Sequence, residues 1–363
     1  MMEKVFDIHI HYSFEIPLEK MIEIFKREFA ETGTEKGAFL SLPHHARNDI
    51  VDYEQLQNIK ALALKQAFSP SFYAFAGLIH PQDYTDKKSI QKEFLRQVEE
   101  YFSVGYDGMK MLEGYPSLLK VRRIPLDDEI YDSYYAFMEE NGYPIIMHIA
   151  NPNENWDISK ASQYAIQAGR VYDSSYPTKD EITGQVFSVM KKYPKLKLIL
   201  AHWGFFSQEK ENAECFLGNY ENTMLDITPG GQQYLHMAKD WRYWHSYIER
   251  YQDKILYGTD FYAFPDENQE EWRTAFMRRP QFIRQFFETD TEHTYVDEKF
   301  RGVLLEKNLR DKIYWNNAEK LLGKASVINK KYMLAEAERL MALPEKQSKY
   351  ADVDLQYILE TLK

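Results

Sequence analysis

Histidine and aspartate residues lie at the ends of several short apolar runs in this sequence, and their types suit metal-dependent chemistry. The first run carries Asp7, His9 and His11 at alternate positions. Side chains alternate between the two faces of a strand, so His9 and His11 would reach a common point. Two neutral imidazoles on one face suit a borderline-soft divalent cation such as Zn2+. A His-x-His pair also arises by chance, so matching residues at other strand ends must support it.

Three further polar residues meet this requirement. His148 ends one apolar run, His202 directly follows another, and Asp260 follows the last one in the segment Gly258-Thr259-Asp260. A single histidine of this kind is often a hydrogen-bonded core residue, but two at equivalent strand ends favour a shared site. A buried carboxylate needs a partner, which a metal ion, a helix N-terminus or an arginine would supply to Asp260. Asp260 would also serve as a general base on a metal-bound water.

Lys110 and Glu113 belong to a fourth run and are candidates for a second metal or for substrate binding. A lysine in an apolar strand must reach solvent or meet an anion. That anion would be a substrate carboxylate or, if Lys110 itself is carboxylated, a carbamate that bridges two metals. A salt bridge inside the fold explains Lys110 equally well.

The elements that position these residues are apolar runs that alternate with amphipathic segments. Near-continuous apolar runs are typical of parallel strands buried on both faces. The alternation predicts an α/β protein, and eight runs fit a closed (β/α)8 TIM barrel better than an open doubly wound sheet, since no glycine-rich loop follows the first run. The predicted strands are 5–10, 37–42, 72–79, 108–112, 144–149, 196–201, 223–227 and 254–257, and the predicted helices are 16–30, 54–67, 90–102, 127–140, 179–192 and 233–250, with a weaker one at 206–217.

We expect residues 1–323 to form the barrel and residues 324–363 to form a C-terminal helical extension, which would provide a contact in a homodimer.

The active site of such a barrel lies at the carboxyl ends of its strands. Asp226, which closes the seventh run, ranks below the main set as a substrate-binding or arginine-binding residue. His44, His45 and His80 are weaker candidates. Trp203, Phe205, Tyr262 and Phe264 are expected to line the pocket, and residues 267–279 to form a lid.

Composition excludes several classes of protein. The 363 residues include 45 Lys+Arg and 56 Asp+Glu, so the net charge is −11, which argues against nucleic-acid and anionic-membrane partners. Hydrophobic residues make up 44%, enough for a large core. The mean hydropathy is −0.57, and no apolar run approaches the roughly 20 residues of a spanning helix. Cys215 alone allows neither an internal disulfide nor a cysteine-clustered zinc site. With no signal peptide at the start, we expect a cytoplasmic protein.

The strand-end residues resemble those of the amidohydrolase superfamily, and residues 315–323 are similar to the terminal Asn-Ala-x-x-Leu-Leu-Gly segment of its amidohydrolase-related branch, which includes aminocarboxymuconate-semialdehyde-type decarboxylases. The resemblance covers about residues 5–323. It implies one divalent metal held by four residues: His9, His11, His148 and Asp260. We favour Zn2+ for this metal, with Mn2+ as the alternative. It places His202 beside the metal, where it orients or deprotonates water, or on a second ion together with Lys110 or Glu113.

The resemblance does not specify a reaction, and our leading hypothesis is hydrolysis of an amide, ester or lactone in a small, carboxylated molecule by a metal-activated water. The alternative is non-oxidative decarboxylation of an aromatic or unsaturated acid on the same site. Decarboxylation would need an aromatic slot and a cation for the carboxylate, for which Arg47, Arg122, Arg123 and Arg170 are candidates. A third hypothesis is a binding protein that has lost catalysis, and phosphoester hydrolysis is a lesser option.

Overall fold

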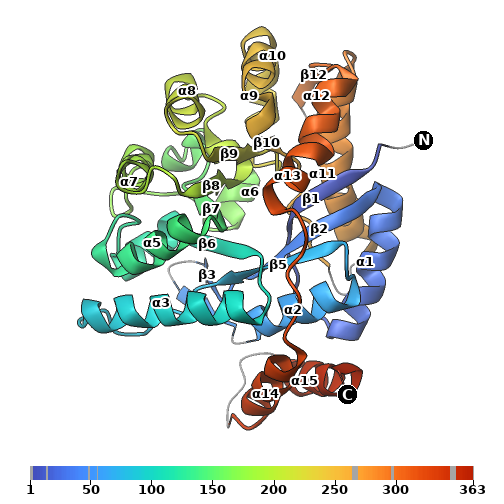
Figure 1. Cartoon of the computed structure of the whole chain (residues 1–363). Helices are drawn as coiled ribbons and strands as arrows, with labels where there is room; N and C mark the ends of the chain where they lie inside the picture. The colour runs from blue at the N-terminus through green and yellow to red at the C-terminus, as the bar shows by residue number, and fades with distance from the viewer. Residues whose placement is uncertain are drawn as a thin grey trace.

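The computed structural model describes residues 3–13, 15–47, 50–54, 56–263, 269–295, 298–343 and 349–362. Within these ranges, eight parallel strands form one sheet whose neighbours follow chain order (Figure 1). Each strand pairs in parallel with its neighbours, as expected when right-handed βα units connect them. The strands are β1 (Val5–Ile10), β2 (Thr34–Leu40), β5 (Phe72–Gly77), β6 (Gly108–Gly114), β7 (Pro144–Ile149), β8 (Lys197–Leu200), β9 (Thr223–Asp226) and β10 (Ile255–Leu256).

Backbone hydrogen bonds between the first and last strands nearly close this sheet into a barrel. Ile8 N donates to Tyr257 O at 3.0 Å, and beyond β10, Asp260 N donates to His9 O at 2.8 Å. His11 N then donates to Phe261 O at 2.8 Å. The predicted (β/α)8 barrel is therefore confirmed. The same hydrogen bonds bring the carboxyl end of the barrel's last strand, β10, beside the two histidines at the end of its first strand, β1.

Most of the helices around the barrel lie where the amphipathic segments predict, but those at 116–122, 163–167 and 269–288 were not predicted. The segment predicted as one helix at 233–250 divides at Asp240, whose φ of −128° and ψ of 49° are not helical. The outer helices are α1 (Leu18–Thr32), α2 (Gln57–Ala67), α3 (Lys87–Val104), α4 (Pro116–Arg122), α5 (Asp132–Asn141), α6 (Gln163–Gln167), α7 (Lys179–Lys192), α8 (Lys210–Asn219), α9 (Gln233–Lys239), α10 (Trp241–Arg250) and α11 (Gln269–Glu288).

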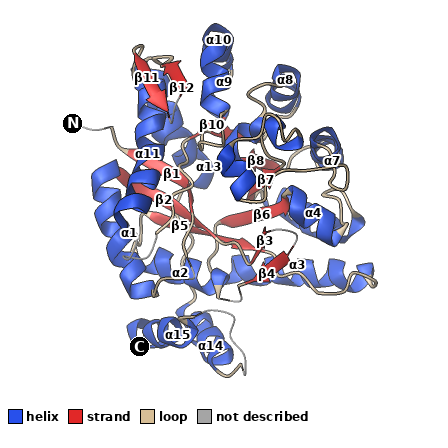
Figure 2. Ribbon diagram, turned by 180° about the vertical axis from the view of Figure 1, so that it is seen from behind, coloured by secondary structure: helices blue, strands red, loops and turns tan. Residues whose placement is uncertain are grey.

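Two antiparallel hairpins lie outside the barrel and were not predicted. The hairpin of β3 (His44–Arg47) and β4 (Ile50–Tyr53) lies next to α4 (Figure 2). The hairpin of β11 (Glu292–Tyr295) and β12 (Glu298–Arg301) follows α11. Phe264 and the first part of the predicted lid lie outside the described residues, and the rest of that lid is the start of α11.

The C-terminal helices dock below α1 and α2 (Figure 1). These two helices are α14 (Lys330–Met341) and α15 (Ala351–Leu362). Before them in the chain come α12 (Lys307–Asp311), a π-helical turn (Lys312–Asn316) and α13 (Asn317–Leu322). A fully buried ion pair joins Lys60 Nζ on α2 to Asp354 Oδ2 on α15 at 2.7 Å. Asp354 Oδ1 also accepts a hydrogen bond from Leu18 N at 2.6 Å, so α15 caps the first turn of α1. None of the helices in the described ranges is long and apolar enough to cross a membrane.

Candidate metal centre

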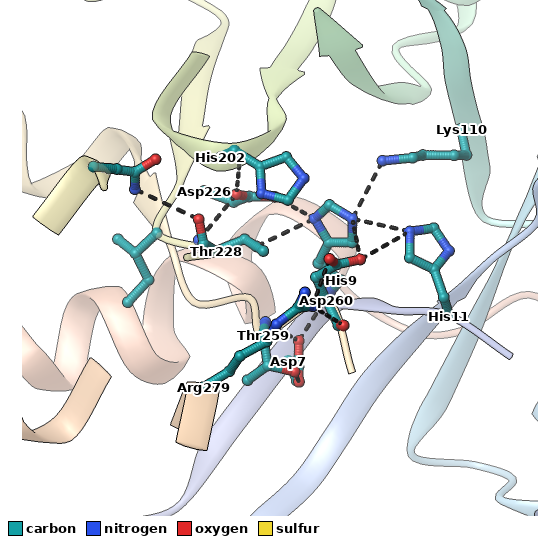
Figure 3. A network of polar contacts seen from close by, with 12 residues as sticks. Asp7, His9, His11, Lys110, His202, Asp226, Thr228, Thr259, Asp260 and Arg279 are labelled. Carbon is teal, nitrogen blue, oxygen red and sulfur yellow. Dashed lines mark hydrogen bonds and ion pairs between the residues drawn. The ribbon is translucent and has the colours of Figure 1, made fainter. Parts of the chain in front are cut away.

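Three of the predicted ligands converge at the barrel rim, where Figure 3 shows them side by side. His9 Nε2 lies 3.1 Å from His11 Nε2. Asp260 Oδ1 lies 3.8 Å from His9 Nε2 and 3.5 Å from His11 Nε2. Ligands at bond lengths of about 2.0–2.1 Å in a tetrahedral site stand roughly 3.4 Å apart. Within the described residues, the donor atoms of these three side chains all lie within 4.8 Å of one another. The arrangement therefore fits a divalent cation.

Hydrogen bonds on the far side of each ring turn the two Nε2 atoms toward this point. His9 Nδ1 donates to Asp226 Oδ2 at 2.8 Å, and Thr228 Oγ1 lies 3.2 Å from the same nitrogen. His11 Nδ1 donates to Leu40 O at 3.0 Å. Burial is the main reason why the pKa of both imidazoles lies well below its usual value. Both rings are therefore neutral, with the Nε2 lone pair free for a metal, as metal-ligating histidines require.

Asp260 is held ionised with one oxygen toward the imidazoles. Arg279 Nη1 on α11 donates to Asp260 Oδ2 at 2.5 Å and also to the Asp260 carbonyl oxygen. Burial raises the pKa of Asp260, but Arg279 and the neighbouring His11 and His9 outweigh burial and hold that pKa well below its usual range. Because Arg279 occupies Oδ2, Oδ1 is the oxygen that faces His9 and His11.

Asp7 joins the two strand ends that carry these ligands. Its Oδ1 accepts hydrogen bonds from His9 N at 3.0 Å and Thr259 N at 3.1 Å, and its Oδ2 accepts one from Thr259 Oγ1 at 2.5 Å. Burial raises the pKa of Asp7 to about 7. Gly258 is required beside this contact, since a Cβ there would lie only 2.9 Å from His9 Cβ and would also collide with Thr228.

Residues with left-handed backbone conformations gather at the same rim. His202, Trp203 and Phe205 have φ of 55°, 57° and 55° in one turn after β8, and Asp260 has φ of 56° after β10. Such conformations cost free energy in residues other than glycine and persist where the surrounding structure enforces them. The strained backbone at two strand ends is typical of a functional site.

His148 and His202 lie beside the three-ligand group. The His202 ring centroid is 4.9 Å from that of His148 and 5.2 Å from that of His9. His202 N donates to Asp226 Oδ1 at 2.7 Å, and burial lowers the pKa of its imidazole to about 3. His148 Nε2 and His202 Nδ1 are buried, and neither has a hydrogen-bond partner in the described part of the chain. His148 falls outside the 4.8 Å group, so its role as a fourth ligand stays a prediction.

Lys110 and Glu113 occupy different environments. Lys110 Nζ lies 3.3 Å from His9 Nε2, and burial lowers the pKa of this ammonium to about 8 (Figure 3). Glu113 Oε1 instead accepts a hydrogen bond from His80 Nε2 at 2.8 Å. The structure thus brings Lys110 to the centre and places Glu113 in a separate buried cluster with His80, where Arg122 also helps to lower the pKa of Glu113. Second-metal roles for either residue stay predictions.

Two residues matter more than the sequence indicated. Asp226 orients His9 and anchors the backbone of His202, whereas strand position alone ranked it as a secondary candidate. Arg279 pairs with Asp260 from a helix 19 residues further along the chain. The position of Asp226 at the end of a predicted strand was the one sequence feature that could have indicated its place in the site. An arginine was one of the partners that the sequence predicted for Asp260, but Arg279 was not singled out, because helix α11 brings it to the site only in the folded protein.

The comparison with protein families identifies this barrel. The family described as amidohydrolase matches residues 40–324, which is more than half of the chain. The chain belongs to the amidohydrolase family. A comparison with curated proteins found no significant match. The first 39 residues, which carry His9 and His11, lie before the matched range, so the geometry is the evidence for their place in the site.

Solved structures share the barrel fold with this chain at low sequence identity. An uncharacterised TIM-barrel protein from Bordetella bronchiseptica is 16% identical with a TM-score of 0.55, covering 88% of this chain and 98% of that one. A 4-oxalomesaconate hydratase from Rhodopseudomonas palustris is 16% identical with a TM-score of 0.52, covering 92% and 98%. A 2,6-dihydroxybenzoate decarboxylase is 16% identical with a TM-score of 0.50, covering 89% and 99%. At this identity the likeness shows the fold.

Proposed function

We propose that this protein is a metal-dependent hydrolase that cleaves a C–N or C–O bond in a small, carboxylated molecule. The observation that carries the proposal is the convergence of two neutral imidazoles and one ionised carboxylate at the carboxyl ends of β1 and β10. His9, His11 and Asp260 would hold the cation, with His148 as a fourth ligand. Zn2+ and Mn2+ both accept such a donor set, and Zn2+ is our first choice.

A divalent cation bound here would supply a water with a pKa near neutrality and would polarise a carbonyl group. The ionised Asp260 carboxylate, with Oδ2 engaged by Arg279, would ligate the cation and would also be the acceptor for a proton of the water. The protonated carboxyl would then return that proton to the leaving nitrogen or oxygen. His202, neutral and unpartnered at Nδ1 within the described structure, is placed to orient the water or the carbonyl oxygen.

Non-oxidative decarboxylation on the same site is the second candidate. The guanidinium carbon of Arg170 lies 5.4 Å from the centre of the Tyr164 ring, and its charge helps to lower the pKa of His148, so this arginine is a candidate for holding the carboxylate of a flat acid. Two structural neighbours are named as a 4-oxalomesaconate hydratase and a 2,6-dihydroxybenzoate decarboxylase, and the second name supports keeping this candidate.

The test is a substrate panel assayed with the full chain loaded with Zn2+ or Mn2+. The panel contains N-acyl amino acids, esters, lactones, and aromatic and unsaturated acids. Incorporation of 18O from solvent reports hydrolysis, and release of carbon dioxide reports decarboxylation. We expect 18O incorporation that falls at least about 100-fold in Asp260→Asn. An exposed arginine variant on α10, Arg242→Gln, is the control and should retain full activity.

Carbon dioxide release without 18O incorporation would replace the first candidate by the second. Full activity of Asp260→Asn would contradict both. A purified protein that retains neither Zn2+ nor Mn2+ would favour the binding-protein hypothesis instead.

A further inference from the structure

The turn that follows β8 and carries His202 is left-handed over four consecutive residues. Residues 202–205 have φ of 55°, 57°, 60° and 55°, and of these only Gly204 lacks a Cβ. Such a turn costs free energy and needs contacts that hold it in place. At its start, His202 N donates to Asp226 Oδ1 at 2.7 Å. At its end, the holding contact comes from Lys179 on α7.

The Lys179 side chain is almost fully buried, and its ammonium group meets three acceptors. Nζ donates to Phe205 O at 2.6 Å and to Asn153 Oδ1 at 2.5 Å, and it forms an ion pair with Glu209 Oε1 at 2.8 Å. An ammonium group has three N–H bonds, so each of them has a partner. Burial lowers the pKa of Lys179, and Glu209 opposes this effect. Burying a charge is costly, and a well-packed apolar side chain often gives equal stability, which favours a role for Lys179 in fixing geometry.

The acceptors of Lys179 lie in the loops that follow β7 and β8. Asn153 comes after β7, whose end carries His148, and Phe205 comes after β8, whose end leads to His202. Lys179 is the first residue of α7, where a capping box holds the helix N-terminus. One side chain with a fixed base therefore joins the two loops that follow these histidines.

The Phe205 ring extends this restraint to the two imidazoles. Its centroid lies 5.2 Å from that of the His202 ring, with 18° between the ring planes, and 5.6 Å from that of the His148 ring. Within the described residues, His202 Nδ1 and His148 Nε2 have no hydrogen-bond partner, so packing against Phe205 helps to set the direction of both rings. Gly230 packs against the same pair, since a Cβ there would lie 2.6 Å from Phe205 Cε1 and 2.9 Å from His202 Cβ. The ring of Phe205 therefore has little room to move.

We propose that Lys179 is a positioning residue, which holds the left-handed turn and the Phe205 ring so that the imidazoles of His202 and His148 keep their places beside the metal centre. This inference rests on the proposed function, since it concerns the histidines proposed there to orient the water and to be the fourth ligand. It adds a residue of an outer helix that acts on the site through the turn and through Phe205.

The test replaces Lys179 by methionine in the Zn2+-loaded full chain and follows backbone hydrogen exchange by mass spectrometry. Exchange in the segment 202–206 should become at least about tenfold faster, since the turn loses a hydrogen bond from a charged group. Exchange in β1 should stay within about twofold of wild type, because the opening is local. Lys179→Gln is measured alongside as a smaller change, and it should give a smaller increase in the same segment; it decides the test if Lys179→Met does not fold.

Two matched controls have the same origin in the fold but leave Phe205 untouched. Gln208→Ala removes a different contact between the same two loops, from Gln208 Nε2 to Glu154 Oε1 at 2.9 Å. Lys192→Met removes an exposed lysine of α7 that pairs with Asp132. Both variants should leave exchange in the segment 202–206 within about twofold of wild type, since exposed contacts contribute little.

Histidine signals report whether the turn acts on the site. In long-range 1H–15N spectra of the Zn2+-loaded protein, the His202 signal is assigned by its loss in His202→Gln. It should shift or broaden in Lys179→Met and keep its position in Lys192→Met. With any substrate of the panel that is turned over, Lys179→Met should lower kcat about 10- to 100-fold and leave KM within about threefold of wild type.

The outcomes separate this inference from the proposed function. Lys179→Met should retain the wild-type Zn2+ content by elemental analysis. A folded variant with faster exchange in every segment, or with unchanged exchange and an unchanged His202 signal, would overturn the positioning role of Lys179 while the metal site stands. A wild-type chain that binds no Zn2+ would instead contradict the proposed function.

Discussion

Replacing Asp226 by asparagine should weaken metal binding by up to about 100-fold through a change of tautomer at His9. Asp226 Oδ1 accepts two backbone N–H groups, from His202 at 2.7 Å and Thr228 at 3.1 Å. Oδ2 accepts the Nδ1 proton of His9 at 2.8 Å. In Asp226→Asn the remaining oxygen must stay with the two N–H donors, since the amide group cannot accept them. The new NH2 group then faces His9 Nδ1 and donates to it.

His9 must in that case carry its proton on Nε2, where it cannot ligate a cation. Loss of a hydrogen-bond partner behind a metal-ligating histidine usually weakens metal binding about 10- to 100-fold, or about 1.4–2.7 kcal/mol. The forced tautomer places Asp226→Asn at the upper end of this range. The dissociation constant for Zn2+ is measured by competition with a chromophoric chelator, and urea unfolding confirms that the variant is folded.

Thr228→Val is the matched control, because it removes only the longer 3.2 Å contact to the same nitrogen of His9. We expect it to weaken Zn2+ binding by less than about threefold, below the range for a lost histidine partner. A folded Asp226→Asn protein whose Zn2+ affinity lies within threefold of wild type would refute this account of how His9 is oriented.

Two further predictions concern the docking of the C-terminal helices. Asp354→Leu leaves Lys60 buried without its partner and should lower the free energy of unfolding by about 3–5 kcal/mol. The double variant Lys60→Met, Asp354→Leu should recover most of that loss. Equal destabilisation by the single and the double variant would contradict the ion-pair explanation. Burial raises the pKa of nearby Glu54 to about 7, so Glu54 favours the folded state below pH 4.5 and loses that contribution as the pH rises through 7. Glu54→Gln should therefore be more stable than wild type at pH 8, by up to about 3 kcal/mol, and this difference should shrink toward pH 5. Urea unfolding of both proteins at pH 8 and pH 5 measures it. A stability difference that does not change with pH would contradict the prediction.

Local sequence pattern was sufficient to predict much of the barrel and part of the site. Buried parallel strands are apolar along their length, and β7 has the bounds that its apolar run predicted. Strand alternation placed His9 and His11 on one face, and their Nε2 atoms do meet. Barrel topology then placed Asp260 beside them, because the last strand pairs with the first.

Contacts that depend on the closed barrel were beyond the reach of local pattern. Asp226 and His9 are 217 residues apart, and their hydrogen bond exists only because β9 and β1 lie near one another across the closed sheet. Arg279 reaches Asp260 from an outer helix whose packing the sequence does not encode locally. The left-handed turn that carries His202 and Trp203 is imposed by tertiary structure, since neither residue type favours such a conformation.

The most direct test of the central claim is the position of a bound metal ion. Crystals of the full chain grown with Zn2+ or Mn2+ are measured on both sides of the absorption edge of that metal. We predict one anomalous peak that contacts His9 Nε2, His11 Nε2 and Asp260 Oδ1. The absence of a peak at saturating metal, or a peak elsewhere with none between these atoms, would contradict the claim that this rim is a metal centre.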